Sequence, residues 1–570
     1  MKGFKESKGS NKRSERNSQI NNNQINLALF KKALVLQKKG ELNKAAEIYN
    51  KLIENNYREE KVFINYATIN QYLKNTNNAV LLLKQAIKIN PSNYIPFFKM
   101  GFILNNNGRF YEAYPFAKKA IELNPRFWEG YHNVIKILRN LNRPNDAANI
   151  AKAAKKLFSN NHLFFGLLGD INSDIGNFKE AVEYYNNAIL LAPDNDETLY
   201  SYANFSIGIG DKKESINFLN KVLKINPYHS ISYYSLSTII NVKENEGIKN
   251  KILNLNINDF KTKNDRYTIL FSQSHIHHKL GAFTKSADFL KKANDLKLLD
   301  KPSNIKEVIN LSETIKTKTC IDKSFNLSKF KYLRDIFIVG LPRSGSTLVE
   351  SIIGMNNDVH NLGENSILLN ALVESEKFYF SNMDDVYLKY SQNFSLKKFT
   401  TNKMLSNYMH IPHLVSKLEH SKVIYTFRNP LDNLLSMFRA KFTGVGNEYS
   451  SSLRDSAEYY MYHFKIMSFY RKKYKESIYF LDYDKLVNNS EAEIRKLIDW
   501  LGFCWDDLYL HPDKSQQGFF TASNVQVRSP INNKSVGGWQ KYSKIMEEPL
   551  NIFRINKFSL DSFKNYLEFD

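Results

Sequence analysis

A period of 34 residues, held in phase for six cycles, constrains the fold of this chain more than any other feature of its sequence. Small residues share one phase: Ala45, Ala79, Ala113, Ala147, Ala181 and Ser215. Other phases carry alanine (Ala86, Ala120, Ala154, Ala188), glycine (Gly40, Gly108, Gly176, Gly210) and proline (Pro91, Pro125, Pro193, Pro227). The period predicts stacked helical pairs, in which glycine occupies a turn, small residues allow close packing, and proline ends the second helix.

The pattern resembles the tetratricopeptide repeat, most clearly in residues 93–126 and 161–194. The resemblance implies an α-helical solenoid, which we expect over residues 25–298, with divergent repeats at its end. The concave groove of such an array usually binds a peptide or protein. The alternative is that the array serves as a scaffold or forms a homodimer. Residues 1–24 are polar and predicted to be disordered, and a change of composition at 299–334 indicates a linker.

Composition limits the classes of partner. A chain of 570 residues is too long for one hydrophobic core, so at least two domains are expected. The net charge of +23 comes from Lys and Arg spread along the chain, so neither nucleic acid nor a membrane is expected as a partner. No long apolar run and no apolar signal core are seen, which favours a cytoplasmic protein.

Metal and disulfide sites are not predicted. The two cysteines, Cys320 and Cys504, lie far apart in the sequence and have no CxxC partner. The histidines of the SHIHHKL segment, His275, His277 and His278, would point in different directions on a helix, so we expect packing or surface roles for them.

The second half of the chain contains a predicted anion site. The apolar run Ile336–Gly340 predicts a buried strand, and the following turn leads into an amphipathic helix. Loop N–H groups and the positive end of a helix dipole converge on an anion in this arrangement. The spacing of Gly340 and Gly345 is that of a Walker A loop, but Ser346 replaces its lysine, which argues against a nucleotide kinase. Arg343, a fork-shaped donor, suits a sulfonate instead.

The segment FIVGLPRSGSTLVESII resembles the 5′-phosphosulfate loop of sulfotransferases that use 3′-phosphoadenylyl sulfate (PAPS). The segment KVIYTFRNPLDNLLSMF resembles their 3′-phosphate motif, with Arg428 and Ser436 as the anion ligands. The two motifs together imply an α/β P-loop-like sulfotransferase domain over residues 335–570, with a central, mainly parallel sheet. They also imply PAPS as the cosubstrate and no metal. The loop residues that would hold the phosphosulfate are Arg343, Ser344, Gly345, Ser346 and Thr347.

Within this family the chain is most similar to the tyrosylprotein sulfotransferases and their repeat-fused bacterial relatives. The resemblance assigns the general base to Glu364, which follows Arg343 by 21 residues, and transition-state stabilisation to Lys403. It places Tyr483 against the adenine.

The resemblance extends to a C-terminal cosubstrate loop. It assigns Ser523 to the phosphosulfate and Lys534 to the nucleotide. An arginine that some members carry four residues after Ser436 is replaced here by Ala440, and Arg439 or Lys441 is the candidate substitute.

The predicted activity is transfer of a sulfuryl group from PAPS to an acceptor hydroxyl. The acceptor class stays open between protein tyrosine, glycan, lipid and metabolite, and the solenoid groove favours a protein or peptide. The alternative function is a solenoid-based binding scaffold with a degenerate catalytic domain.

Overall fold

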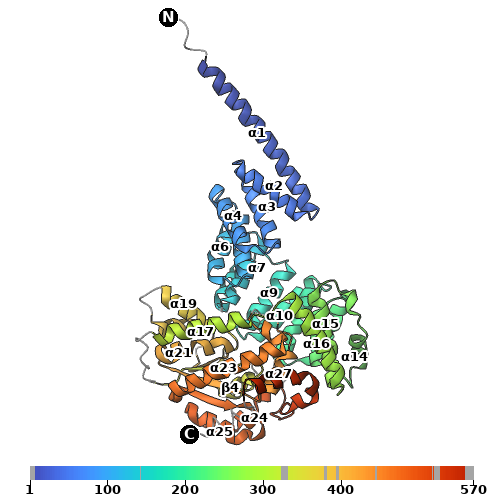
Figure 1. The fold of residues 1–570 in the computed structure, drawn as a ribbon, viewed down its shortest axis with the longest axis vertical. Coiled ribbons are helices and arrows are strands. Elements are labelled where there is room, and N and C mark those ends of the chain that lie inside the picture. Colours follow the sequence, from blue (N-terminus) through green and yellow to red (C-terminus); the bar gives the residue numbers. More distant parts are fainter. Residues whose placement is uncertain are drawn as a thin grey trace. The chain divides into compact units, whose positions relative to one another are not determined.

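The computed structural model describes residues 7–141, 143–321, 332–377, 382–392, 394, 397–442, 446–515, 518 and 527–558. The chain divides into two compact units, Met1–Ser159 and Asn160–Asp570. The described part of the first unit is helical, and the second unit contains both helices and a sheet (Figure 1).

The first unit consists of paired helices. Their bounds are α1 (Ser7–Lys38), α2 (Leu42–Glu54), α3 (Glu60–Tyr72), α4 (Thr76–Ile89), α5 (Tyr94–Asn106), α6 (Phe110–Leu123), α7 (Trp128–Asn140) and α8 (Pro144–Ala154). The small residues of the 34-residue phase, Ala45, Ala79, Ala113 and Ala147, are fully buried. Helix α1 begins at Ser7, within the segment 1–24. The disorder that the sequence predicts for this segment remains a prediction.

Glycine occupies the predicted turn position of the repeats in a left-handed conformation. The φ values are 80° at Gly40, 73° at Gly108 and 81° at Gly176. Lys74 lies on the same phase and adopts φ 60° without being glycine. This position therefore imposes the same backbone geometry on a residue whose Cβ disfavours it.

The repeat array continues in the second unit. Its helices are α9 (His162–Asp174), α10 (Phe178–Leu191), α11 (Asp196–Ile209), α12 (Lys212–Ile225), α13 (Ser230–Ile239), α14 (Glu246–Leu253), α15 (Lys263–Lys279) and α16 (Phe283–Asp300). Pro193 and Pro227 each follow a helix end by two residues, as the sequence predicted. The helical solenoid is thereby confirmed.

The α/β part of the second unit is built on a sheet of five parallel strands in the order β2-β3-β1-β4-β5. The strands are β1 (Asp335–Gly340), β2 (Val359–Asn361), β3 (Phe399–Asn402), β4 (Ser421–Phe427) and β5 (Ile478–Asp482). The flanking helices are α17 (Ile305–Ile321), α18 (Ser346–Ile353), α19 (Ile367–Lys377), α20 (Met383–Gln392), α21 (Ile411–Lys417), α22 (Pro430–Phe438), α23 (Leu453–Lys473), α24 (Tyr483–Asn488), α25 (Ser490–Leu501) and α27 (Ser543–Ile555). The predicted parallel sheet is confirmed.

Strand β1 is the central strand, and all of its residues are buried. Since alternate side chains of a strand point to opposite sides, both faces of β1 are covered. Ile336 and Ile338 pack with residues of α18 and α25. Phe337 and Val339 belong to the cluster on the other face, which includes residues of α20, α22 and α23.

The end of the repeat array and the α/β part share this second hydrophobic cluster. Tyr267 and Phe271 of α15 and Leu290 of α16 belong to the same cluster as Phe337 of β1. Helix α17 lies within residues 299–334, the predicted linker, and Ile305 at its start packs against this cluster. The domain boundaries predicted at residues 298 and 335 therefore lie between elements that share one hydrophobic cluster. These boundaries remain predictions.

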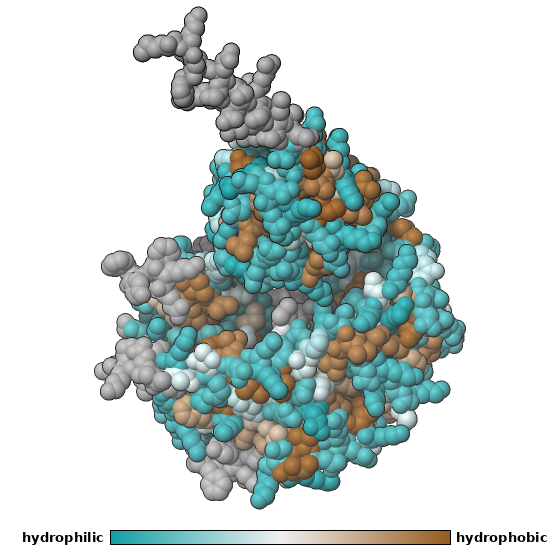
Figure 2. All heavy atoms as spheres, turned by 45° about the horizontal axis from the view of Figure 1, so that its top comes forward, coloured by the Kyte–Doolittle hydropathy of each residue, from teal (hydrophilic) through white to brown (hydrophobic). Residues whose placement is uncertain are grey.

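The surface is mainly hydrophilic on the face shown in Figure 2, where hydrophobic side chains form small separate patches. Among the described helices, none has the length and apolar character needed to cross a membrane.

Candidate anion-binding and transfer site

The loop between β1 and α18 forms a tight turn at the carboxyl end of the central strand. Gly345 precedes α18 with φ 97°, and a Cβ there would come within 2.2 Å of the Tyr483 ring. Gly340 has φ 153°, and its Cβ would come within 2.5 Å of the Thr426 carbonyl oxygen. Both glycines are thus required by space as well as by conformation. Arg343 itself adopts φ 68°, an unusual conformation for a residue with a side chain.

Three residues with hydroxyl groups, one in the loop and two at the start of α18, are buried. The Ser344 hydroxyl lies 2.7 Å from that of Thr426 on the neighbouring strand β4, which ties the loop to the sheet. Ser346 and Thr347 form the first turn of α18 and are almost fully buried. The first N–H groups of a helix have no partner within the helix, so this end of α18 presents donors suited to an anion.

Arg428 lies directly after β4, and Asn429 caps the following helix by accepting hydrogen bonds from Leu431 and Asp432. The Arg428 guanidinium donates to the Ser535 carbonyl oxygen at 2.9 Å and lies over the Tyr483 ring at 4.8 Å from its centre. Its Nε is buried and has no hydrogen-bond partner among the described residues.

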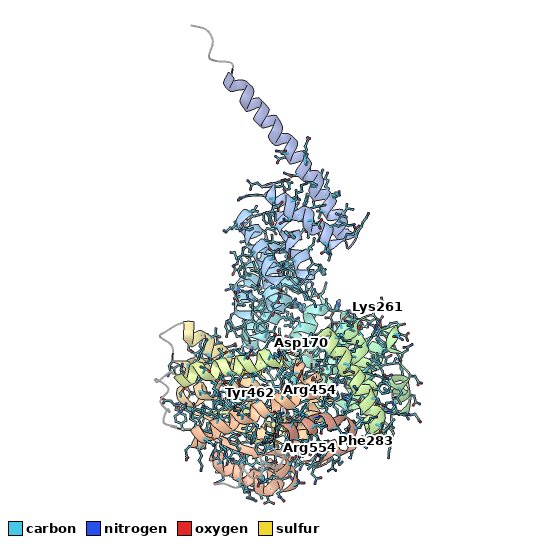
Figure 3. All side chains as sticks on the ribbon, viewed as in Figure 1. Asp170, Lys261, Phe283, Arg454, Tyr462 and Arg554 are labelled. Carbon is cyan, nitrogen blue, oxygen red and sulfur yellow. The ribbon has the colours of Figure 1, made fainter. Side chains whose placement is uncertain are left out.

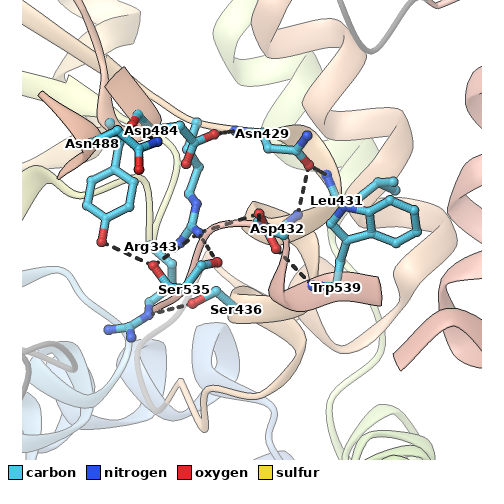
Figure 4. Close-up of polar contacts among 12 residues, drawn as sticks. Arg343, Asn429, Leu431, Asp432, Ser436, Asp484, Asn488, Ser535 and Trp539 are labelled. Atoms are coloured by element: carbon cyan, nitrogen blue, oxygen red, sulfur yellow. Dashed lines mark hydrogen bonds and ion pairs between the residues drawn. The ribbon is translucent and has the colours of Figure 1, made fainter. Parts of the chain in front are cut away.

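Arg343 and Arg428 converge on the same region. The Arg343 Nε donates to the Ser436 hydroxyl at 3.2 Å (Figure 4). Burial, together with the positive charge of nearby Arg428, lowers the pKa of Arg343 to about 10. The guanidinium remains charged at neutral pH, so the structure concentrates buried positive charge here.

A C-terminal loop closes over this cluster. The Asp432 carboxylate accepts from the N–H groups of Gly537 at 2.7 Å and Trp539 at 2.9 Å, as Figure 4 shows for Trp539. Asp432 also lies 3.8 Å from Arg428, and its pKa is raised by burial against the opposing effect of that arginine. The Tyr483 hydroxyl contacts the Ser535 hydroxyl at 3.2 Å.

A second cluster surrounds Lys403, whose side chain is completely buried after β3. Its Nζ lies 2.7 Å from Glu364 Oε1 and 4.0 Å from Glu350 Oε2. Glu364 is half exposed, whereas Glu350 is buried. Glu350 also accepts from Gly363 N–H and the Thr401 hydroxyl, both at 3.1 Å. Burial raises the pKa of Glu350, although the charge of Lys403 opposes this.

The predicted site residues thus gather in two groups, both attached to the loop and helix α18. Arg343, Arg428, Ser436 and Tyr483 form one group, and Glu364 with Lys403 forms the other. Lys534 is exposed beside Ser535, and Ser523 lies outside the described residues. In the part of the chain that the structure describes, no group of three or more His, Cys, Asp and Glu side chains could hold a metal ion.

Sequence reasoning missed Glu350, Asp432 and Ser535. Each acts across a large sequence separation: Asp432 pairs with Gly537, and Glu350 pairs with Lys403. The only local signal was that Glu350 is the one charged residue of α18.

Comparisons with known proteins match both halves of the chain. Residues 369–507 match the model described as Sulfotransferase family. Tetratricopeptide repeat models match residues 27–57, 60–93, 97–127, 164–195 and 196–229.

Two curated relatives were found for part of the chain. An uncharacterized protein of Aquifex aeolicus is 26% identical over 245 residues, which is 39% of this chain and 32% of that protein. Protein-tyrosine sulfotransferase 1 of Danio rerio is 24% identical over 257 residues, which is 40% of this chain and 72% of that protein. The chain therefore spans about a third of the length of the first relative and about three quarters of the second.

Two solved structures are similar to parts of the chain. YrrB, a tetratricopeptide repeat protein, is 18% identical, with a TM-score of 0.27, and covers 33% of this chain and 98% of its own. Pseudomonas aeruginosa PilF is 16% identical, with a TM-score of 0.32, and covers 38% of this chain and 99% of its own.

Proposed function

The chain carries tetratricopeptide repeats and a C-terminal sulfotransferase-family domain, and from this we propose that it transfers a sulfuryl group from PAPS to an acceptor hydroxyl. The observation that supports PAPS best is the convergence of Arg343, Arg428 and Ser436 beside the first turn of α18. A donor with phosphate groups at both its 5′ and 3′ positions needs two such anion contacts.

The side chains in this cluster fit a polyanion. Arg428 has a buried Nε without a partner among the described residues, and the Asp432 carboxylate, 3.8 Å from its guanidinium, already accepts two backbone N–H groups. Buried charge that is only partly compensated is costly, so a bound phosphate would stabilise this arrangement.

When bound, PAPS supplies the sulfuryl group and leaves as adenosine 3′,5′-bisphosphate. In our proposal the loop residues Ser344, Gly345, Ser346 and Thr347, with Arg343, hold the phosphosulfate at the start of α18. Arg428 and Ser436 hold the 3′-phosphate. The Tyr483 ring offers an aromatic surface for the adenine, and the loop carrying Lys534 and Ser535 covers the nucleotide.

Glu364 is proposed as the general base that removes the proton of the acceptor hydroxyl, because it is the half-exposed carboxylate of the second cluster. Lys403 orients Glu364 through their 2.7 Å contact and stabilises negative charge on the leaving phosphate. Glu350 holds Lys403 from the buried side and fixes Gly363, the residue before the base.

The proposed acceptor is a protein or peptide, with a tyrosine hydroxyl as the first candidate. This rests on the repeats, which are typical of protein-binding arrays, and on the partial similarity to a protein-tyrosine sulfotransferase. Incubating cell extract with labelled PAPS and the enzyme, followed by mass spectrometry, identifies the fraction that gains SO3. Labelling of glycan or lipid without protein contradicts the assignment of the acceptor.

Nucleotide binding gives the direct test of the donor. Calorimetric titration with adenosine 3′,5′-bisphosphate should show binding that EDTA leaves unchanged, since no metal is proposed. Arg428→Ala should weaken it by about 1.5 to 3 kcal/mol, the range for a hydrogen bond to a charged group.

The matched control is Arg495→Ala on α25, because Arg495 contacts the Glu491 carboxylate and the Trp505 ring and none of the proposed nucleotide ligands. It should bind the nucleotide as the unsubstituted protein does. A requirement for magnesium would support a nucleotide kinase instead, and full affinity of Arg428→Ala would remove that residue from the site.

A further inference from the structure

The segment Arg528–Tyr542, called the strap below, crosses the cluster that is proposed to bind the nucleotide. The Ser535 carbonyl oxygen in its middle accepts from the Arg428 guanidinium at 2.9 Å. The Asp432 carboxylate accepts from two backbone N–H groups of the strap, one of them that of Trp539 (Figure 4). The middle of the strap is therefore bonded to the residues that begin and carry α22.

The first end of the strap is fastened to a turn of the repeat array. The Arg528 guanidinium donates to the Gly208 carbonyl oxygen of α11 at 3.1 Å and to the Ser515 carbonyl oxygen at 2.5 Å. The last carbonyl groups of a helix lack partners within it, and a cation is favourable at this end of the helix dipole. Arg528 thus supplies a charge-assisted hydrogen bond where α11 cannot supply a donor.

The glycine of this turn leaves room for the arginine. Gly210, which follows α11, has φ 94°, and a Cβ there would lie 3.4 Å from the Arg528 Nε. Gly176 occupies the same phase of the previous repeat with φ 81°, and no described atom beyond its chain neighbours lies within 4 Å of its Cβ position. The repeat period explains glycine at both turns, whereas contact with the strap is found at the Gly210 turn.

The last residue of the strap is fastened to the next helices of the array. The Tyr542 hydroxyl bonds to His278 of α15 at 2.8 Å and to Ser286 of α16 at 2.9 Å. Phe283, labelled in Figure 3, packs against the Tyr542 ring with 5.7 Å between the ring centres. Tyr542 is only 2% exposed, so these bonds satisfy a hydroxyl that is shielded from water.

The array is also bonded to the end of α22. The segment Phe438–Lys441 follows Ser436, and its backbone groups bond to the side chains of Asn294, His275 and Tyr234 at 2.9, 3.3 and 3.3 Å. These three side chains belong to α16, α15 and α13. The repeat helices therefore hold both the strap and the helix whose beginning the strap contacts.

We propose that the repeat array holds the strap closed over the nucleotide, with Arg528 and Tyr542 as positioning residues that limit the rate at which the nucleotide leaves. This inference rests on the proposed function. Both residues act through the backbone between them, Arg528 at the beginning of the strap and Tyr542 at its end. The nucleotide leaves when Ser535 separates from Arg428, and the two anchors oppose that movement.

The dissociation rate of adenosine 3′,5′-bisphosphate from the immobilised full chain, measured by surface plasmon resonance, tests the first anchor. Arg528→Met removes both hydrogen bonds and should raise this rate about tenfold or more with an unchanged association rate, as expected for a lost charged hydrogen bond. Arg528→Lys keeps a cationic donor, and its rate should lie between those of Arg528→Met and the unsubstituted protein. An unchanged dissociation rate in Arg528→Met overturns the proposal.

The matched control is Arg266→Met on α15. Arg266 is a partly buried arginine of the same array, and it donates to the Phe260 carbonyl oxygen at 2.8 Å. Its substitution should lower the thermal unfolding temperature and leave the dissociation rate unchanged. If Arg266→Met accelerates release as much as Arg528→Met does, the effect reflects general stability and the proposal is overturned.

The second anchor is tested by Tyr542→Phe, which removes the hydroxyl and keeps the ring against Phe283. The dissociation rate should rise about two- to tenfold, the factor that corresponds to a neutral hydrogen bond. Tyr233→Phe on α13 is the control, because Tyr233 is buried and its hydroxyl donates to the Pro227 carbonyl oxygen at 3.1 Å within the array. Equal rates for the two variants overturn the role of Tyr542.

The failures of the two proposals are distinguishable. If the unsubstituted chain does not bind the bisphosphate, the proposed function and this inference both fall. If it binds, and Arg528→Met and Tyr542→Phe release the nucleotide at the unsubstituted rate, only this inference falls. A variant that does not fold lowers the binding capacity of the surface instead of accelerating release, and Arg528→Lys then provides the measurement at the first anchor.

Discussion

At the scale of single residues, the two carboxylates beside Lys403 differ in their suitability for the proposed role of general base. Glu350 is buried and occupied by Gly363 and Thr401, whereas Glu364 is half exposed. Glu364→Gln should therefore lower kcat by about 10² to 10⁴, the range for a lost general base, with unchanged nucleotide affinity. Transfer from labelled PAPS measures kcat, and the exposed Glu491→Gln is the control. Near-normal turnover in Glu364→Gln would assign the base to another residue.

Glu350 should make stability depend on pH. Because burial raises its pKa above the usual value of 4.5, the folded protein binds this proton more tightly than the unfolded chain. Stability should therefore fall as pH rises from about 4.5 through the raised pKa. Glu350→Gln removes this effect, so its thermal unfolding temperature should rise relative to that of the unsubstituted protein between about pH 4 and pH 7. A difference that decreases over this range contradicts the prediction.

At the scale of helices and turns, Lys74 occupies a position that its repeat relatives fill with glycine. Its φ of 60° is unfavourable for a residue with a Cβ, so Lys74→Gly should stabilise the first unit by about 0.5 to 1 kcal/mol. Gly108→Ala should have the opposite effect, because no atom lies near its added Cβ and only the backbone conformation is penalised. Thermal unfolding followed by circular dichroism measures both changes, and destabilisation by Lys74→Gly would refute the argument.

The local elements were predictable from the sequence because each follows from a short-range pattern. The 34-residue period predicted the helical pairs, and the apolar run Ile336–Gly340 predicted the central strand. The shared core between α15, α16 and β1 was not predictable, because Phe271 and Phe337 are both ordinary apolar residues in their own elements. Neither local pattern specifies which distant residues pack against the element that it predicts.

The proximity of the candidate site residues was predictable from the sequence in part. The resemblance to two sulfotransferase motifs implied Arg343, Arg428 and Ser436, and the structure brings these three residues together, although their roles remain predictions. The residues that support them, Asp432 and Ser535, were missed because their contacts join α22 to a loop about a hundred residues away.

At the scale of the whole molecule, the two compact units should differ in function. The contacts of α13, α15 and α16 with the segment after α22, next to the proposed nucleotide site, all lie within Asn160–Asp570. A chain beginning at Asn160 should therefore bind adenosine 3′,5′-bisphosphate with unchanged Kd, while KM for a protein acceptor should rise if the removed repeats contribute to acceptor binding. Steady-state kinetics with the protein acceptor and with a small phenol separate the two effects. An unchanged KM for the protein acceptor would favour the scaffold role of the first unit.

A chain beginning at residue 299 is expected to behave differently. It lacks Tyr267, Phe271 and Leu290, which belong to the same hydrophobic cluster as Phe337, so a large apolar surface would be exposed. We expect this shorter chain to aggregate or to lose its cooperative thermal transition, which circular dichroism and size-exclusion chromatography would detect. A stable, nucleotide-binding product would show that the α/β part folds without the array.

The contacts of His275, Asn294 and Tyr234 with the segment after α22 also have a thermodynamic consequence. Helices α13, α15 and α16 belong to the repeat array and also contact the segment that follows Ser436, a residue of the proposed nucleotide site. If a polypeptide bound to the array favoured one arrangement of these helices, its binding would be linked to that of the nucleotide, and each would change the affinity for the other by the same factor. Capture and release of an acceptor would then follow the exchange of PAPS for its product.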